Sequence, residues 1–357
     1  MTPTAPGERV VSLDAFRGLT IAAMILVNNP GTWEAVYWPL DHAAWHGWTP
    51  TDLIFPFFLF MVGMSLHFSR KESLGAALRR TAILFGLGLF LNGFPFFALD
   101  TRLPGVLQRI ALCYLAGWVV VRRLALVAQV VITLALLVVY WALLTQVPVP
   151  GVGPSNLEPG TNLAAWVDSH VYLGRMYMKT WDPEGVLSTL PAIATTLLGA
   201  LAGAWLRGAR ESRLRAAGFV IAGALLAALG VAWGESFPIN KNLWTSSYVL
   251  LTGGLASALF GLCYLLADVW RYRLWTRPFV VYGTNAILIY VGAALVTRTL
   301  RVTKVHGTSL HDHAFETFLA VTGLEIHAAS LAWACLVVAF WYVILRALDR
   351  RGLHWRV

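Results

Sequence analysis

The sequence predicts an all-α integral membrane protein, a polytopic bundle of about ten transmembrane helices with both termini in the cytoplasm. Of the 357 residues, 58% are hydrophobic and only 13% are charged, whereas a soluble domain has about 25% charged residues. Ten stretches are apolar over roughly the 20 residues that a helix needs to cross a bilayer. Lys and Arg are also distributed unevenly between alternate connections. This composition excludes a soluble enzyme, a disordered chain and a nucleic-acid binder.

The ten predicted spans are separated by short connections. They cover residues 11–29, 51–69, 76–98, 103–121, 124–146, 184–206, 213–233, 244–267, 278–297 and 328–348. No room remains for a separate soluble domain, so we expect a single transmembrane domain over residues 1–357. Its sizeable outward loops are 30–50, 147–183 and 298–327.

The positive charges set the expected orientation. With a cytoplasmic N-terminus, 18 of the 27 Lys and Arg residues fall in inside segments and seven in outside segments, while Arg17 and Arg109 lie within spans. Because Lys and Arg are retained on the cytoplasmic side, both termini are expected on that side of a cell (inner) membrane. The net charge of +9 then reflects orientation and contact with anionic lipids. Loop 30–50 has no Lys or Arg and faces outward.

Two arginines occur where a bilayer disfavours them. Arg17 lies three residues after Asp14, so the two side chains share a helix face and can form an ion pair. The pair is either structural or leaves Arg17 to hold an anion that enters from the cytoplasm. Arg109 lies about two turns into the fourth span, and its partner is either a carboxylate in the bundle or a phosphate of a ligand. Asn28 places an amide at the outer end of the first span, although Asn before Pro-Gly is also ordinary turn chemistry.

The outward loop 30–50 is rich in aromatic, imidazole and carboxylate side chains. Its four tryptophans are either residues of an interfacial belt or the wall of a cavity that stacks on a sugar-like ring. His42 has an acidic neighbour and aromatic residues around it, which favours a general base. Thr49 or Thr51 can cap the next helix. Asp52 then lies in the first turn of that helix, where it is placed to orient a histidine.

Two histidine pairs have some of the spacing of metal ligands. His42 and His46 lie in the same loop, and His311 and His313 flank Asp312 further along the chain. Neither pair has an obvious third ligand, and two histidines in a polar loop are weak evidence for a metal site. We therefore expect no bound metal.

Seven motifs occur in an order that resembles one family of membrane enzymes. They are SLDAFRG (12–18), VN (27–28), HAAWHGWTPTDLIFPFF (42–58), LQRIA (107–111), DPEG (182–185), PINKNLW (238–244) and GTNAILIYV (283–291). The family is the heparan-α-glucosaminide N-acetyltransferases, which belong to a wider set of transmembrane acyltransferases. The NKNLW block and the histidine loop are the more specific motifs, whereas SLDAFRG is shared by the wider set. Residues after 298 match poorly.

The resemblance implies an enzyme that takes acetyl-CoA from the cytosol and acetylates a glucosamine amine on the far side of the membrane. It places the family's functional histidine at His42 and a functional asparagine at Asn28. A histidine near neutral pH can take the amine proton or carry the acetyl group. An amide donor can stabilise charge on the thioester oxygen. His46 stands where the family has an asparagine, which leaves the identity of the acceptor open.

We therefore expect an acetyl-CoA-dependent N-acetyltransferase, with a single transmembrane acyltransferase domain and with His42, Asn28 and Asp52 as its catalytic residues. The expected acetyl-CoA ligands are Arg17, Arg109, Asn240, Lys241 and Asn242. Expected partners are an amino-sugar or glycan acceptor, the lipid bilayer and, as relatives suggest, a second copy in a homodimer, without nucleic acid. The alternative is a transporter or flippase of a small anionic or sugar-like substrate without acyl chemistry. It would explain the buried arginines but not the histidine- and tryptophan-rich loop.

Overall fold

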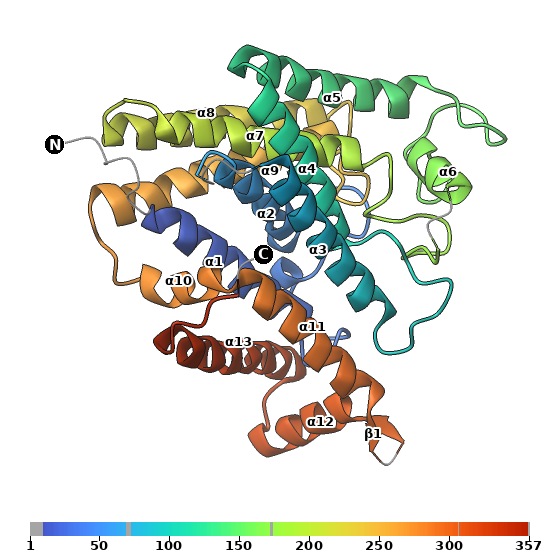
Figure 1. Cartoon of the computed structure of the whole chain (residues 1–357). Helices are drawn as coiled ribbons and strands as arrows, with labels where there is room; N and C mark the ends of the chain where they lie inside the picture. Colours follow the sequence, from blue (N-terminus) through green and yellow to red (C-terminus); the bar gives the residue numbers. More distant parts are fainter. Residues whose placement is uncertain (1–9, 69–72, 172–173, 306, 356–357) are drawn as a thin grey trace. The chain divides into compact units, whose positions relative to one another are not determined.

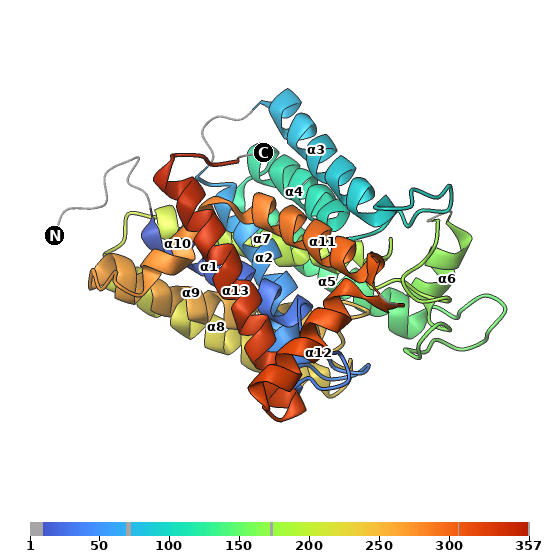
Figure 2. The same ribbon diagram turned by 90° about the horizontal axis from the view of Figure 1, so that it is seen from below.

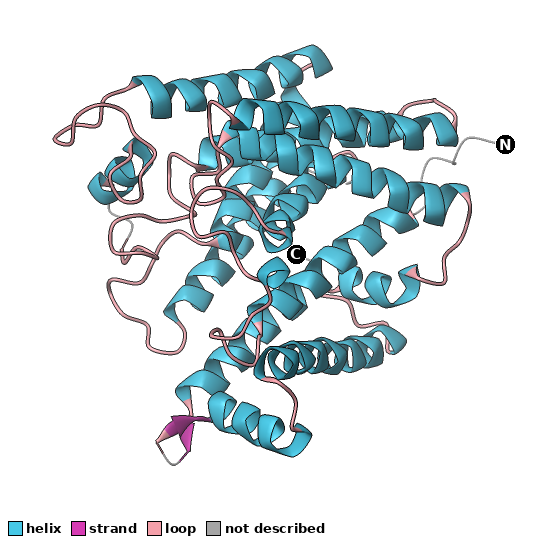
Figure 3. Ribbon diagram, turned by 180° about the vertical axis from the view of Figure 1, so that it is seen from behind, coloured by secondary structure: helices cyan, strands magenta, loops and turns pink. Residues whose placement is uncertain are grey.

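The computed structural model describes residues 10–68, 73–171, 174–305 and 307–355, and this part of the chain is mostly helical, with almost no sheet (Figure 3). Its strands, β1 (Lys304–Val305) and β2 (Thr308–Ser309), pair antiparallel. The longer helices are α1 (Val11–Asn28), α3 (Leu74–Gly93), α4 (Val106–Arg123), α5 (Leu126–Gln146), α7 (Thr189–Arg207), α8 (Ser212–Gly234), α9 (Ser246–Tyr264), α11 (Ala286–Val302) and α13 (Ile326–Arg350). The shorter elements are η1 (Trp38–Leu40), η2 (Pro50–Leu53), α2 (Ile54–Ser65), α6 (Leu163–His170), η3 (Leu265–Val269), α10 (Thr276–Thr284) and α12 (Leu310–Thr322). The expected all-α class is confirmed.

The described residues form two compact units, which the chain enters alternately. The large unit contains residues 43–48 and the described part of 55–265, which includes α2 to α9. The small unit contains residues 10–42, 49–54 and the described part of 266–355, which includes α1, η1, η2 and α10 to α13.

Close approach of helix backbones organises the large unit. Helices α8 and α9 lie side by side (Figure 1 and Figure 2), because glycines remove the side chains that would separate them. A Cβ atom added at Gly223 would lie 2.6 Å from the Gly254 carbonyl oxygen, and one added at Gly230 would lie 2.4 Å from the Leu251 amide nitrogen. The unit also packs α3 on α4, and it packs α7 against α4, α5 and α9.

Helix α1 is central to the small unit, where it contacts α10, α11 and α13. Gly18 lets the α1 backbone approach α10, since an added Cβ would lie only 1.7 Å from the Phe279 carbonyl oxygen. At the end of α1, the Asn29 Nδ2 group donates to the Ile25 carbonyl oxygen at 2.7 Å. Asn29 Oδ1 accepts a hydrogen bond from Thr297 of α11 at 2.6 Å. Helix α1 is therefore held at two positions, by the backbone contact at Gly18 and by the buried side-chain amide of Asn29.

Helices lie at all ten predicted positions, although not all of them pass a test of length and hydropathy for a membrane span. Seven helices of the described chain are long and apolar enough to cross a membrane, namely α1, α3, α5, α7, α8, α9 with its η3 extension, and α13. Helices α10 and α11 pass the same test together as one bent span, while η2 with α2 is apolar but shorter. Helix α4 coincides with the remaining prediction and carries Arg109, Arg122 and Arg123 within its 18 residues.

Two local features of the structure are not predicted from the sequence. The predicted span 278–297 bends by 79° between α10 and α11, because Asn285 has φ −122° and ψ 32°, outside the helical region. The segments 147–183 and 298–327 are also more than loops, since they contain α6 and α12. Both helices are short and partly polar, so hydropathy over a membrane-sized window does not reveal them.

The paired histidines near residue 312 belong to helix α12. Ser309 caps this helix by accepting the Asp312 N–H at 3.1 Å, so His311 and His313 lie in its first turn. His311 Nδ1 lies 3.1 Å from Asp312 Oδ1. Within the described ranges, no group of three or more His, Cys, Asp or Glu side chains is placed to hold a metal ion.

Gly18→Ala is expected to destabilise the protein, because the added methyl group has to displace the backbone of α10. Overpacking of this kind lowers the free energy of unfolding by about 1–3 kcal/mol. The measurement is thermal unfolding of the purified protein in detergent. Gly86→Ala in α3 is the matched control, since nothing lies within 4 Å of its added Cβ and alanine favours a helix. Equal melting temperatures for Gly18→Ala and the wild type would contradict the tight contact of α1 with α10.

Candidate functional site

A buried carboxylate holds a partly exposed imidazole in the small unit. His42 Nδ1 lies 2.7 Å from Asp52 Oδ1. The Asp52 side chain is 1% exposed, whereas that of His42 is 48% exposed. An ionised carboxylate favours the tautomer with the proton on Nδ1, which leaves Nε2 as the basic nitrogen. The arrangement suits an imidazole that takes a proton from a molecule outside the fold.

Asp52 is itself fixed by the start of the next helix. Its Oδ2 accepts the N–H of Thr49 at 3.0 Å, within a capping box around η2, so the carboxylate supplies the acceptor that a helix start needs. The Thr49 hydroxyl donates to the Asp41 carbonyl oxygen at 2.6 Å. The residue before His42 is therefore tied to the same turn that carries Asp52.

Asn28 and Arg17 both lie on α1 in the same unit. Asn28 is the last residue of the helix, and its exposed side chain has no hydrogen-bond partner among the described residues. Its neighbour Asn29 is buried and serves the contact with α11. Arg17 Nη1 lies 3.3 Å from Asp14 Oδ1, and their side chains are 24% and 17% exposed. Because η2 contacts α1, the helix that carries Asn28 and the turn that carries Asp52 are neighbours.

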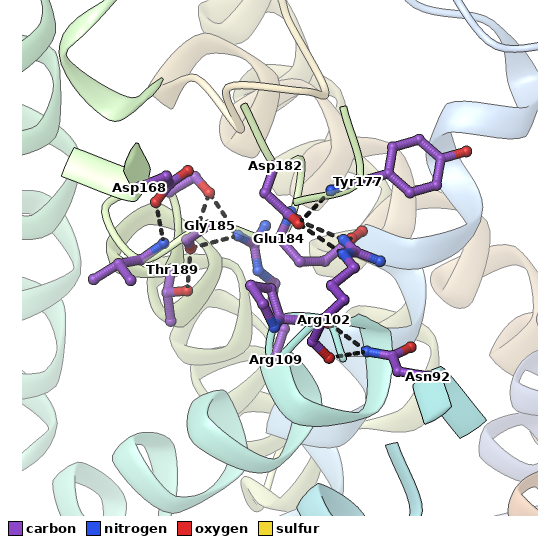
Figure 4. A network of polar contacts seen from close by, with 12 residues as sticks. Asn92, Arg102, Arg109, Asp168, Tyr177, Asp182, Glu184, Gly185 and Thr189 are labelled. Carbon is purple, nitrogen blue, oxygen red and sulfur yellow. Dashed lines mark hydrogen bonds and ion pairs between the residues drawn. The ribbon is translucent and has the colours of Figure 1, made fainter. Parts of the chain in front are cut away.

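Arg109 is buried in the large unit, where it forms no ion pair with the described residues (Figure 4). Its Nη2 donates to the Gly185 carbonyl oxygen at 3.0 Å and to the Ser188 hydroxyl. The guanidinium carbon lies 5.2 Å from the centroid of the Trp244 ring. Nε and Nη1 have no hydrogen-bond partner in the described chain. Within the described chain, Arg109 thus contacts a backbone oxygen, a hydroxyl and an aromatic face, and the carboxylate considered as its partner is not found there.

Charged side chains hold the turn that Arg109 contacts. Arg102 forms ion pairs with Asp182 and Glu184, the two acids of the DPEG motif. Burial alone would lower the pKa of Arg102, but the hydrogen bond and attraction of Asp182, together with Glu184, raise it above its ordinary value. Figure 4 shows Arg102 and Arg109 directed toward this same short segment. The DPEG motif is therefore a turn that precedes α7 and is held by the ion pairs of Arg102.

Asp168 adds a buried carboxylate to that turn. Its Oδ1 accepts the Val186 N–H at 2.8 Å, and a Cβ added at Gly185 would lie 1.9 Å from its Oδ2. Burial raises the pKa of Asp168 to about 6, although the bond from Val186 opposes the shift, while nearby Asp182 adds to it. The carboxyl group therefore changes its charge near pH 6.

The NKNLW block forms a buried turn that holds part of the histidine loop. Asn240 is fully buried, and its Oδ1 accepts the Leu243 N–H at 2.9 Å. Its Nδ2 lies 3.3 Å from His46 Nδ1. Gly47, which follows His46, donates its N–H to the carbonyl oxygen of Ile239, which precedes Asn240, at 2.7 Å. The Asn240 side chain is thus engaged within the protein.

Trp244, the last residue of the NKNLW motif, belongs to this cluster, although the sequence assigns it no role of its own. It has a left-handed φ of 54° and is fully buried, and its ring N–H donates to the Thr195 hydroxyl at 3.0 Å. Its ring connects the NKNLW turn to Arg109. The expected acetyl-CoA ligands are divided between the units: Arg17 lies in the small unit, and Arg109, Asn240, Lys241 and Asn242 lie in the large unit.

The tryptophans of loop 30–50 have different environments. Trp45 packs in a hydrophobic cluster of the large unit, and its ring N–H donates to the Leu157 carbonyl oxygen at 2.9 Å. In the small unit, Trp33 lies against the Arg301 guanidinium, 5.8 Å from its ring centroid, and Trp38 is 68% exposed. Trp45 is therefore a structural anchor, whereas Trp33 and Trp38 keep surface for a membrane interface or a sugar ring.

Comparison with known proteins places these residues in a matched region. The family model described as "Heparan-alpha-glucosaminide N-acetyltransferase, catalytic" matches residues 9–233. The mouse (Mus musculus) heparan-alpha-glucosaminide N-acetyltransferase is 27% identical over 425 aligned residues, which cover 100% of this chain and 62% of that protein. The human (Homo sapiens) protein of the same name is 28% identical over 420 residues, 98% of this chain and 60% of that protein. The chain spans about three fifths of the length of these relatives. The resemblance drawn from the motifs is confirmed.

Asp168→Asn is expected to change how stability depends on pH. The folded-state pKa of about 6 exceeds the ordinary value of 3.8, so the wild-type free energy of unfolding decreases as the pH rises between these values and is level above them. The decrease is at most about 3 kcal/mol. Asparagine keeps an acceptor for Val186 and does not titrate, so its curve should be flatter by that amount. Unfolding measurements between pH 4 and 7 make the comparison, and parallel curves would mean that Asp168 titrates normally.

Proposed function

The chain belongs to the heparan-alpha-glucosaminide N-acetyltransferase catalytic family, and on that premise we propose that it is a membrane-embedded acetyltransferase. It moves an acetyl group from cytosolic acetyl-CoA to an amine on the outer side of the membrane. The acceptor is an amino sugar such as a terminal glucosamine. The observation that carries this proposal is the contact of the buried Asp52 carboxylate with the half-exposed His42 ring.

The chemistry assigned to the site requires one base and one charge-stabilising donor. The acceptor nitrogen attacks the thioester carbonyl carbon, the C–S bond breaks, and the CoA thiolate leaves. His42 Nε2 takes the proton from the nitrogen, or it attacks first and carries the acetyl group to the amine. Asp52 holds the ring and stabilises its protonated form. The exposed Asn28 amide donates to the carbonyl oxygen as that atom gains charge.

The residues proposed to bind the donor are those expected from the sequence. In the small unit, Arg17 supplies positive charge on the side expected to be cytoplasmic. In the large unit, Arg109 retains two donor groups without partners in the described chain, and Lys241 and Asn242 lie in the turn next to its Trp244 contact. Asn240 contributes by holding that turn, since both ends of its amide are engaged. We propose a homodimer in a cell (inner) membrane as the working form.

His42→Ala should reduce acetyl transfer by about 10²-fold or more, the range for loss of a positioned base, while acetyl-CoA binding stays nearly intact. Asn28→Ala should cost a comparable factor, because it removes a charge-stabilising donor. The assay follows transfer of radiolabelled acetyl to glucosamine and release of CoA thiol by the purified protein. His46→Ala is the comparison within the same loop and should be much milder than His42→Ala, since the family has another residue there.

Asp52→Asn separates positioning from binding. Asparagine keeps an oxygen for the Thr49 N–H but loses the charge that favours the Nδ1–H tautomer, so kcat should fall with little change in KM for acetyl-CoA.

Turnover of His42→Ala within a few-fold of wild type would remove His42 from the mechanism. Substrate uptake without any CoA release by the wild-type protein would favour the transporter alternative.

The orientation is tested by cysteine labelling from outside intact cells. A cysteine placed at Leu40 should react with a membrane-impermeant reagent, and one placed at Gly75 should not, because basic segments stay in the cytoplasm. Cys335 is exposed, so the background is first made free of cysteine. The reverse labelling pattern would invert the proposed topology, and with it the side from which acetyl-CoA enters.

A further inference from the structure

The break between α10 and α11 buries an amide that the fold only half satisfies. Asn285 at the 79° bend is 0% exposed. Its Oδ1 accepts the N–H of Trp355 at 3.1 Å. Its Nδ2 is equally buried, yet it has no hydrogen-bond partner in the described chain. A buried donor without a partner is costly, most of all in a membrane protein, so this atom points to a ligand that supplies an acceptor.

The same place holds the start of a helix. Helix α11 has 17 residues, and Asn285 is its N-cap residue, but the Asn285 side chain forms no capping hydrogen bond. The first-turn N–H groups of a helix have no partners within that helix, and the helix dipole makes this end positive. Broken membrane helices direct such ends toward anionic groups. The Asn285 Nδ2 donor and the first-turn N–H groups of α11 therefore both lie at the break between α10 and α11.

The SLDAFRG motif of α1 packs directly on this region. A Cβ added at Gly18 would lie 2.9 Å from the Gly283 amide nitrogen, and one added at Gly283 would lie 2.2 Å from the Asp14 carbonyl oxygen. Arg17 follows Asp14 by three residues, within 3.3 Å of its carboxylate, and directly precedes Gly18. It lies six residues, or about 9 Å, into α1. The motif that packs on the break therefore also carries a guanidinium group, which can supply positive charge to an anion.

We propose that the α10–α11 break is a binding site for a phosphate group of the acyl donor, and this rests on the proposed acetyl-CoA-dependent function. Phosphate oxygens accept hydrogen bonds from Asn285 Nδ2 and from the first-turn N–H groups of α11, and Arg17 supplies the countercharge. The site offers donors and a cation, which suits a phosphate better than the amides of a pantetheine arm. Because Nδ2 is closed to solvent, occupancy requires the segment at Trp355 to move aside.

The test measures CoA and pantetheine binding to the purified full chain by calorimetry. Asn285→Asp keeps the size of the side chain and the acceptor for Trp355, but it replaces the free donor with an acceptor. It should weaken CoA binding by about 10-fold or more, in the range of a charge-assisted bond, and leave binding of phosphate-free pantetheine unchanged.

Arg17→Gln should also weaken CoA binding and leave pantetheine binding unchanged. Thr284→Val is the matched control at the same break, since the Thr284 hydroxyl only donates to the Val281 carbonyl oxygen, and its CoA affinity should equal that of wild type.

The outcomes separate the site from the function. Size-exclusion profiles and melting temperatures establish that each variant is folded, and Asn285→Leu replaces Asn285→Asp if the latter does not fold. Wild-type CoA affinity in both Asn285 variants overturns the site while the proposed function stands. Equal losses of CoA and pantetheine binding also overturn it, because the effect is then not on a phosphate. A wild-type protein that binds no CoA overturns both proposals.

Discussion

A polar group buried in a membrane-spanning chain is costly unless it has a partner inside the protein or on a ligand, because hydrocarbon offers none. Much of the described structure follows from this constraint. Asn29 bonds to its own helix and to α11, Arg109 bonds to a turn carbonyl, and Asn240 bonds to the backbone of its own turn. The partners are mostly carbonyl and N–H groups at helix ends and turns, where backbone hydrogen bonding is incomplete. Buried polar side chains therefore shape the turns between apolar helices.

The same constraint joins stability and chemistry at Asp52. One oxygen of its carboxylate accepts the Thr49 N–H and completes the helix start, and the other oxygen contacts His42. The helix cap keeps a buried charge compensated, and that charge holds the imidazole. An acid in the first turn of a helix is ordinary capping chemistry. It becomes a positioning group because residues 41 and 42 are tied back to the same turn.

The sequence predicts the local features well and the distant ones poorly. A helix lies at each of the ten positions that hydropathy indicates, and seven of these helices are long and apolar enough to cross a membrane. Capping rules place Thr49 and Asp52, because both signals depend on residues close together in the chain. The Gly185 partner of Arg109 lies 76 residues away, and the His46–Asn240 contact joins residues 194 apart. Such pairs have no periodic signature. The bend at Asn285 is missed for another reason, since one non-helical residue does not change the hydropathy of an apolar stretch.

The histidine loop is the place where the chain passes repeatedly between the two units. It leaves the small unit after His42, enters the large unit at 43–48, and returns at Thr49 before entering the large unit again. Each unit fixes its own part of the loop. In the large unit the anchors are the Trp45 bond to Leu157 and the bond from Gly47 to Ile239, and in the small unit they are the bonds of Thr49. Because hydrogen bonds hold the loop at several residues, it loses little further conformational entropy when a substrate binds. His42 and Asp52 come before and after the 43–48 segment in the chain, yet both belong to the small unit, so their contact forms within that unit.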